Sequence, residues 1–298
     1  MTAATVSHDQ AVPLVTALVS VVARDAGVRA LCIKGPTFAA YDLRPGHGSR
    51  DVDVLCEPAG HDRLVRALCA AGWTAHDPGD DVHRVLPAHA VTLTHDRWTC
   101  SIDVHHYFPG FLGPAADVFE VLYARATTVE VAHARVPAPD LPSAAVVWGL
   151  NVLRAPSEQD SVREIDWVER VAQADMDRGA LAAVAAATGA TSTLGPLLDL
   201  AGIARPTTGL GTPRQLMLWH LLQQPGTRGG GLLTRFRERP LRAWPGTVRE
   251  VVWPQTPPPD GRSQLQHNLE RLRTGPALVP ELVRRTRRAR RQAREHGR

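Results

Sequence analysis

One short segment, Asp51-Val52-Asp53-Val54-Leu55, constrains the fold of this chain more than any other. Its alternation of acidic and apolar residues is typical of a strand with one face in a core, because successive side chains point to opposite faces. Asp51 and Asp53 therefore share a face, while Val52 and Val54 enter the core. Neighbouring carboxylates repel each other unless a cation or proton lies between them. The segment is either a set of oxygen ligands of the kind Mg²⁺ prefers or the polar face of a solvated edge strand.

Lys34 is the only lysine among 34 basic residues. The arginine excess accompanies abundant Ala, Gly and Pro, which indicates a general coding bias and says little about function. A lysine in such a background favours a site that needs a compact ammonium on a flexible stem, and chance survival is the alternative. Lys34 follows the apolar run 31–33 and precedes Gly35, where a backbone without a side chain can approach a phosphate.

A third carboxylate lies on another predicted strand, 99–105. Asp103 and His105 share one face of that strand, and the apolar residues between and before them face the other way. An imidazole therefore accompanies this carboxylate. Three further histidines are spaced six apart, a spacing that matches no recognised metal site, and we expect them at the surface: His83, His89 and His95.

The order of elements divides the chain. Strand patterns are expected at 29–33, 51–57, 73–76, 82–86, 90–94, 99–105 and 127–136, with 73–105 forming a meander. Helix patterns are expected at 9–26, 37–41, 58–71, 115–125, 143–153, 162–174, 178–202, 213–223 and 264–273. The proline-rich segment 137–142 is the best boundary, because strand signals nearly vanish beyond it. We predict an α+β domain over 1–139, a helical domain over 140–280 and an arginine-rich tail over 281–298.

The charge is concentrated in the tail. The whole chain carries +4, and residues 281–298 hold eight arginines and two glutamates, so the remainder is slightly acidic. A basic tail can bind nucleic acid, but a solvated helix face is more common, and this tail has no aromatic residue to stack on bases. Nucleic acid is therefore not a favoured partner.

Composition and cysteine usage predict a soluble cytoplasmic protein. Hydrophobic residues make up 44% of the chain, which is typical of a globular protein. The four cysteines show no Cys-x-x-Cys spacing, and we expect reduced, buried thiols. The first residues lack the features of a signal peptide. The longest apolar run, 11–23, is too short to span a bilayer, so we expect no membrane partner.

These motifs together resemble a known family. They are Ile33-Lys34-Gly35, Tyr41, Asp51-Val52-Asp53-Val54-Leu55 and Ile102-Asp103-Val104-His105. In this order they resemble the uncharacterised nucleotidyltransferase family, which belongs to the DNA-polymerase-β-like superfamily, over about residues 28–175. The resemblance implies a catalytic domain with a mixed sheet, followed by a helical domain.

The resemblance also implies roles for residues. In the superfamily, carboxylates hold divalent metals that bridge a triphosphate and activate an acceptor hydroxyl for attack on the α-phosphorus, which releases pyrophosphate. Asp51, Asp53 and Asp103 would accordingly ligate Mg²⁺ or Mn²⁺, with Asp103 also acting as base. Lys34 and Gly35 would contact phosphate. His105 would touch the acceptor or orient Asp103; a core histidine bonded to backbone is the alternative.

The loop before the acidic strand departs from the family pattern. The Gly-Ser pair typical of the superfamily is Gly35-Pro36 here, and Ser49 could replace that serine only if the loop folded back, which we do not expect. Arg44 and Arg50 are both displaced from the usual arginine position. Which of the two contacts phosphate stays open.

Three functions remain. The favoured one is Mg²⁺-dependent transfer of a nucleoside monophosphate from an NTP, such as ATP, to an unidentified hydroxyl acceptor: a small molecule, a peptide or a protein. The second is a non-catalytic relative that binds a nucleotide or a partner protein. The third is an RNA-modifying enzyme that grips RNA with its basic tail.

Overall fold

The computed structural model describes residues 6–44, 49–76, 89–154, 160–223, 263, 284 and 287–293. The chain forms two compact units, residues 1–77 with 89–212 and residues 78–88 with 213–298. The boundary predicted near residue 139 lies inside the first unit, and the three-part division stays a prediction. The strand predicted at 82–86 and the helix predicted at 264–273 lie outside the described residues.

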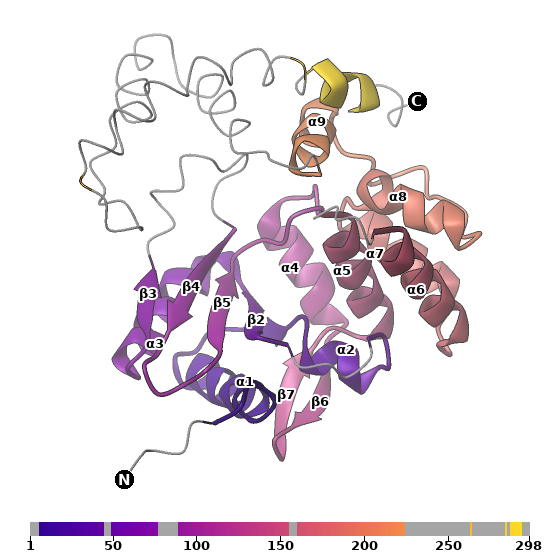
Figure 1. Ribbon diagram of the computed structural model, residues 1–298. Coiled ribbons are helices and arrows are strands. Elements are labelled where there is room, and N and C mark those ends of the chain that lie inside the picture. Colours follow the sequence, from indigo (N-terminus) through magenta and orange to yellow (C-terminus); the bar gives the residue numbers. More distant parts are fainter. Residues whose placement is uncertain are drawn as a thin grey trace. The chain divides into compact units, whose positions relative to one another are not determined.

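The first unit is built on a five-stranded mixed sheet, in the order β1-β2-β5-β4-β3 (Figure 1). The strands are β1 (Ala30–Cys32), β2 (Asp51–Cys56), β3 (Thr74–His76), β4 (Ala90–Thr94) and β5 (Ser101–His105). β3, β4 and β5 form the predicted antiparallel meander. β2 pairs parallel with β5 and antiparallel with β1. The α+β class with a mixed sheet is confirmed.

The register of the central strands brings polar residues together. Asp53 lies opposite Asp103, and Leu55 lies opposite His105, on the parallel neighbours β2 and β5. Thr92 of β4 lies opposite Asp103 on its other side. Because paired residues on neighbouring strands point to the same face, one face of the sheet carries this polar row.

The opposite face is apolar and is covered by α1 (His8–Asp25) and α3 (His61–Ala70), the latter preceded by the 3₁₀ turn η1 (Pro58–Gly60). Val52, Val54, Ile102 and Val104 belong to this core. Full burial of such a side chain stabilises a fold by about 1.5–3 kcal/mol. A slip of one residue would exchange these side chains with the aspartates, so the core fixes the register of the site.

A separate hairpin packs beside β1. Its strands are β6 (Thr127–Val131) and β7 (Ala134–Ala138), where the sequence predicted one strand over 127–136. The chain reverses at Ala132 and His133, which have φ of 48° and 61°. The single-strand prediction is wrong because this turn uses neither glycine nor asparagine, the usual signals for positive φ. The hairpin forms a small apolar cluster with Cys32 at the end of β1.

Helices complete the first unit: α2 (Pro36–Ala40), α4 (Ala115–Ala124), α5 (Leu141–Arg154), α6 (Asp160–Gln173), α7 (Arg178–Ala187) and α8 (Thr191–Leu200). α5 contacts α6, α7 and α8 and buries ten of its residues, so it is a rigid support. The second unit contains α9 (Pro213–Leu222). None of the described helices has both the length and the hydropathy needed to cross a membrane.

Candidate active site

Asp53 lies at the centre of the polar face and is only 3% exposed. Its Oδ1 accepts a hydrogen bond from the Lys34 ammonium at 2.6 Å and lies 2.9 Å from Nε2 of His105. Lys34 reaches it because β1 ends two residues earlier and the N–H of Ile33 still bonds to the carbonyl of Asp53. One buried carboxylate oxygen therefore contacts both a lysine and a histidine.

These contacts set the charge of the carboxylates. Burial alone would raise the pKa of Asp53, but the His105 hydrogen bond and the Lys34 charge outweigh burial and hold that pKa well below its usual range. Burial, and then the charge of Asp53, raise the pKa of Asp51. Asp53 is therefore the firmly anionic member of the pair.

Asp53, Asp103 and His105 form a cluster in which one ligand atom from each lies within 4.8 Å of the others. Asp103 also accepts a hydrogen bond from the Thr92 hydroxyl at 2.6 Å. Nδ1 of His105 is buried without a hydrogen-bond partner among the described residues. Two carboxylates and one imidazole fit a divalent cation such as Mg²⁺ or Mn²⁺, with the imidazole favouring the softer ion.

Asp51 is held to one side of this cluster. The Ser49 hydroxyl lies 2.9 Å from the backbone oxygen of Asp51 and 3.0 Å from its Oδ1. The three carboxylates of Asp51, Asp53 and Asp103 were predicted to form one metal site. The structure instead brings the last two together with His105. The role of Asp51 as a metal ligand stays a prediction.

Ser49 also lies against Gly35, so the expectation that the loop does not fold back is wrong. Gly35 has φ +46°, and a Cβ placed there would lie 3.2 Å from Cβ of Ser49. The close approach depends on glycine, because a side chain at Gly35 would push Ser49 away. A hydroxyl therefore stands beside Gly35, although it comes from a position 14 residues further along the chain than Gly35.

Arg44 and Arg50 are both exposed. Arg44, Gly35 and Ser49 line a cavity of about 400 Å³ with residues of α1 and of the β6–β7 hairpin, and its lining does not include Asp53, Asp103 or His105. Arg50 directly precedes the acidic strand β2. Either arginine as a phosphate contact stays a prediction, as do the phosphate roles of Lys34 and Gly35.

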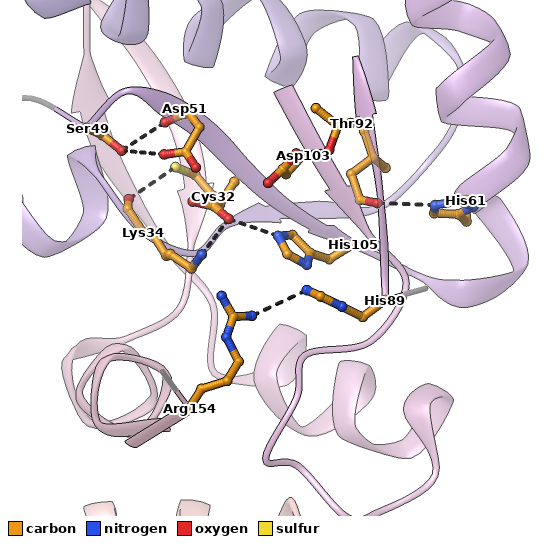
Figure 2. A network of polar contacts seen from close by, with 12 residues as sticks. Cys32, Lys34, Ser49, Asp51, His61, His89, Thr92, Asp103, His105 and Arg154 are labelled. Atoms are coloured by element: carbon orange, nitrogen blue, oxygen red, sulfur yellow. Dashed lines mark hydrogen bonds and ion pairs between the residues drawn. The ribbon is translucent and has the colours of Figure 1, made fainter. Parts of the chain in front are cut away.

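Sequence reasoning missed Arg154, the last residue of α5. Its guanidinium lies 3.3 Å from Nε2 of His89 and over the Phe108 ring, and Figure 2 shows it pointing toward the site. Burial lowers the pKa of Arg154, and the charges of Asp53, Asp103 and Asp51 oppose that effect. No local signal marks one arginine among so many.

His89 was expected at the surface, and this expectation is wrong. Its side chain is half-buried, and its ring lies 5.4 Å from the ring of His105. His95 is also half-buried, with its ring 5.4 Å from that of Trp73. The six-residue spacing did not predict the burial of these side chains, because His89 and His95 lie at opposite ends of β4 and pack against different neighbours. His83 lies outside the described residues.

A mixed sheet with carboxylates on its parallel strands and Lys-Gly beyond β1 is the arrangement of a nucleotidyltransferase-like protein. A profile of the family described as "Uncharacterised nucleotidyltransferase" matches residues 10–204, and the chain belongs to this family. Among solved structures, the chain is similar to an antigenic nucleotidyltransferase-like protein from Paracoccidioides brasiliensis. That match has 13% identity and a TM-score of 0.41, and covers 66% of this chain and 95% of the other. No functionally curated protein matches.

Proposed function

We propose that this protein transfers a nucleoside monophosphate from an NTP, such as ATP, to a hydroxyl acceptor in a reaction that needs Mg²⁺ or Mn²⁺. The observation that carries the proposal is the pairing of Asp53 with Asp103 across β2 and β5, with His105 within ligand distance. Family membership supports the class of reaction. The proposal includes a cytoplasmic location.

The chain's own residues have distinct tasks in this proposal. Asp53, Asp103 and His105 would hold the metal, which when bound supplies charge to stabilise the attacking and leaving oxygens. Asp103 would also take the proton of the attacking hydroxyl, as pyrophosphate leaves. Lys34 leaves Asp53 to meet a phosphate oxygen, and Gly35 leaves room for the triphosphate beside Ser49.

A second candidate is a non-catalytic nucleotide-binding protein. The observation that favours it is that Oδ1 of Asp53 already contacts both Lys34 and His105, so this oxygen has cationic and hydrogen-bonding partners without any metal. In such a protein, nucleotide binding at the same place would regulate a partner protein.

The test uses NTPs labelled at the α-phosphorus, with Mg²⁺ or Mn²⁺ and acceptors from three classes: small hydroxyl compounds, proteins and RNA. We expect label transfer and pyrophosphate release with the wild type and neither with Asp53→Asn/Asp103→Asn. Asp175→Asn, an exposed aspartate, is the matched control. Binding of metal–NTP without pyrophosphate release in any class would favour the second candidate. Equally poor binding of metal–NTP by the wild type and an Asp51→Ala/Asp53→Ala variant would refute both.

A further inference from the structure

Arg154 is a cation without a carboxylate partner in the described part of the chain, although it is half-buried. Its guanidinium contacts an imidazole nitrogen of His89 at 3.3 Å and the face of Phe108, with 5.6 Å from Cζ to the ring centroid. Removing a guanidinium from water is costly unless an anion compensates it. Asp51, Asp53 and Asp103 act on it only through space.

Phe108 connects this arginine to Lys34. The Lys34 ammonium lies 5.5 Å from the same ring centroid. Phe108 is 1% exposed, so the ring is fixed and both cations rest on a rigid surface. One cation comes from the end of β1 and the other from the end of α5, two elements far apart in sequence.

His89 fixes the direction of the guanidinium. An N–H of Arg154 meets Nε2 of His89, which stands just before β4, and α5 is anchored by its buried residues. An arginine fork has more N–H donors than this contact uses. Because α5 anchors the backbone of Arg154 and His89 holds one N–H of its guanidinium, the other N–H groups are suited to bidentate contact with phosphate oxygens.

We propose that Arg154 binds the polyphosphate of the donor nucleotide and forms, with Lys34, a two-cation clamp over Phe108. This inference rests on the proposed function, because it assigns the second phosphate-binding cation of the same site. A metal held by the carboxylates would neutralise one side of the polyphosphate, and the clamp would neutralise the other. The nucleoside part makes no use of the clamp, so recognition by Arg154 is independent of the base.

The experiment measures binding of inorganic tripolyphosphate and of ATP to the full chain with Mn²⁺, by titration calorimetry. We expect Arg154→Gln to weaken tripolyphosphate binding by about tenfold or more, because it removes hydrogen bonds to a charged group. Arg154→Lys should retain part of the affinity. Arg178→Gln, which removes an exposed arginine at the start of α7, should bind like the wild type.

Circular dichroism melting of each variant separates a binding defect from misfolding, and Arg154→Lys preserves the charge if Arg154→Gln does not fold. Wild-type affinity in folded Arg154→Gln would overturn the inference, as would a wild type that binds no tripolyphosphate. Polyphosphate binding that depends on Arg154, without nucleotidyl transfer to any acceptor, would support the inference while the proposed activity fails. Nucleotidyl transfer that is unaffected by Arg154→Gln would support the proposed activity and contradict the inference.

Discussion

Asp53 bonds to both Lys34 and His105 through a single oxygen, and this geometry governs the site at the residue scale. The Lys34 side chain is 12% exposed and that of Asp53 1%, so the pair is shielded from water. A metal that bound Oδ1 of Asp53 would compete with the Lys34 ammonium for that oxygen. In the proposed function, metal binding would then favour release of Lys34 toward phosphate.

Lys34→Met should destabilise the metal-free protein. Removing one partner of a buried ion pair leaves the other uncompensated, and we expect a loss of about 3 kcal/mol in the free energy of unfolding, with His105 compensating in part. Urea denaturation in EDTA measures this. Mn²⁺ should restore part of the loss in the variant, because it replaces the missing positive charge. An unchanged denaturation midpoint in EDTA would contradict the account.

The four thiols should differ in reactivity. Cys32, Cys56 and Cys100 are buried as expected, but Cys69 is exposed on the solvent side of α3, so the expectation of a buried thiol is wrong there. Burial raises the pKa of Cys32 to about 11 and that of Cys56 to about 12, so these two are thiols at neutral pH, whereas the thiolate is the reactive form. Brief treatment with iodoacetamide at pH 8, followed by peptide mass spectrometry, should label Cys69 first. If Cys32 or Cys56 were labelled as fast as Cys69 in the folded protein, the burial of β1 and β2 would be contradicted.

The candidate residues were accessible to sequence reasoning where local patterns carry the information. Alternation in β2 and β5 placed Asp53, Asp103 and His105 on polar strand faces. Their adjacency depends on the parallel pairing of β2 with β5, which no local pattern specifies. Arg154 has no sequence signal at all, because its position follows from the packing of α5.

At the scale of elements, the turn at Gly35 positions the end of β1 against the loop before β2. Gly35→Ala should cost about 1–2 kcal/mol of stability, because φ is +46° and the new Cβ meets Ser49. It should also weaken tripolyphosphate binding, since Ser49 must move. Denaturation and calorimetry measure the two effects.

Gly27 provides the matched control for this substitution. Its φ is +64°, but a Cβ there meets nothing within 4 Å. Gly27→Ala should therefore lose about 1 kcal/mol of stability from backbone strain alone and keep its tripolyphosphate affinity. Equal loss of affinity in both variants would refute a specific role for the Gly35–Ser49 approach.

The β6–β7 hairpin offers a stabilising substitution. His133 has φ 61°, is almost fully exposed and makes only a loose contact with Glu130 at 3.7 Å. His133→Gly should raise the free energy of unfolding by about 0.5–1 kcal/mol, because glycine accepts positive φ without strain. A fall in the melting temperature would mean that the His133 side chain contributes to the hairpin.

At the scale of the molecule, the sequence predicted the order of strands and helices well and the division into units less directly. The strand-to-helix change after residue 139 was visible as a composition change. The first unit nevertheless includes α5 to α8, and α5 supplies Arg154 to the site. Packing between distant segments decides such a boundary, and local propensity does not report it.

The most direct test of the central claim is a Mn²⁺ titration followed by electron paramagnetic resonance, with and without ATP. We expect the wild type to bind Mn²⁺, ATP to tighten this binding, and folded Asp103→Asn to lose affinity for Mn²⁺ by at least about tenfold. Asp175→Asn should match the wild type. Equal Mn²⁺ affinity in the wild type and Asp103→Asn would contradict the claim that Asp53, Asp103 and His105 form a metal site for a nucleotide.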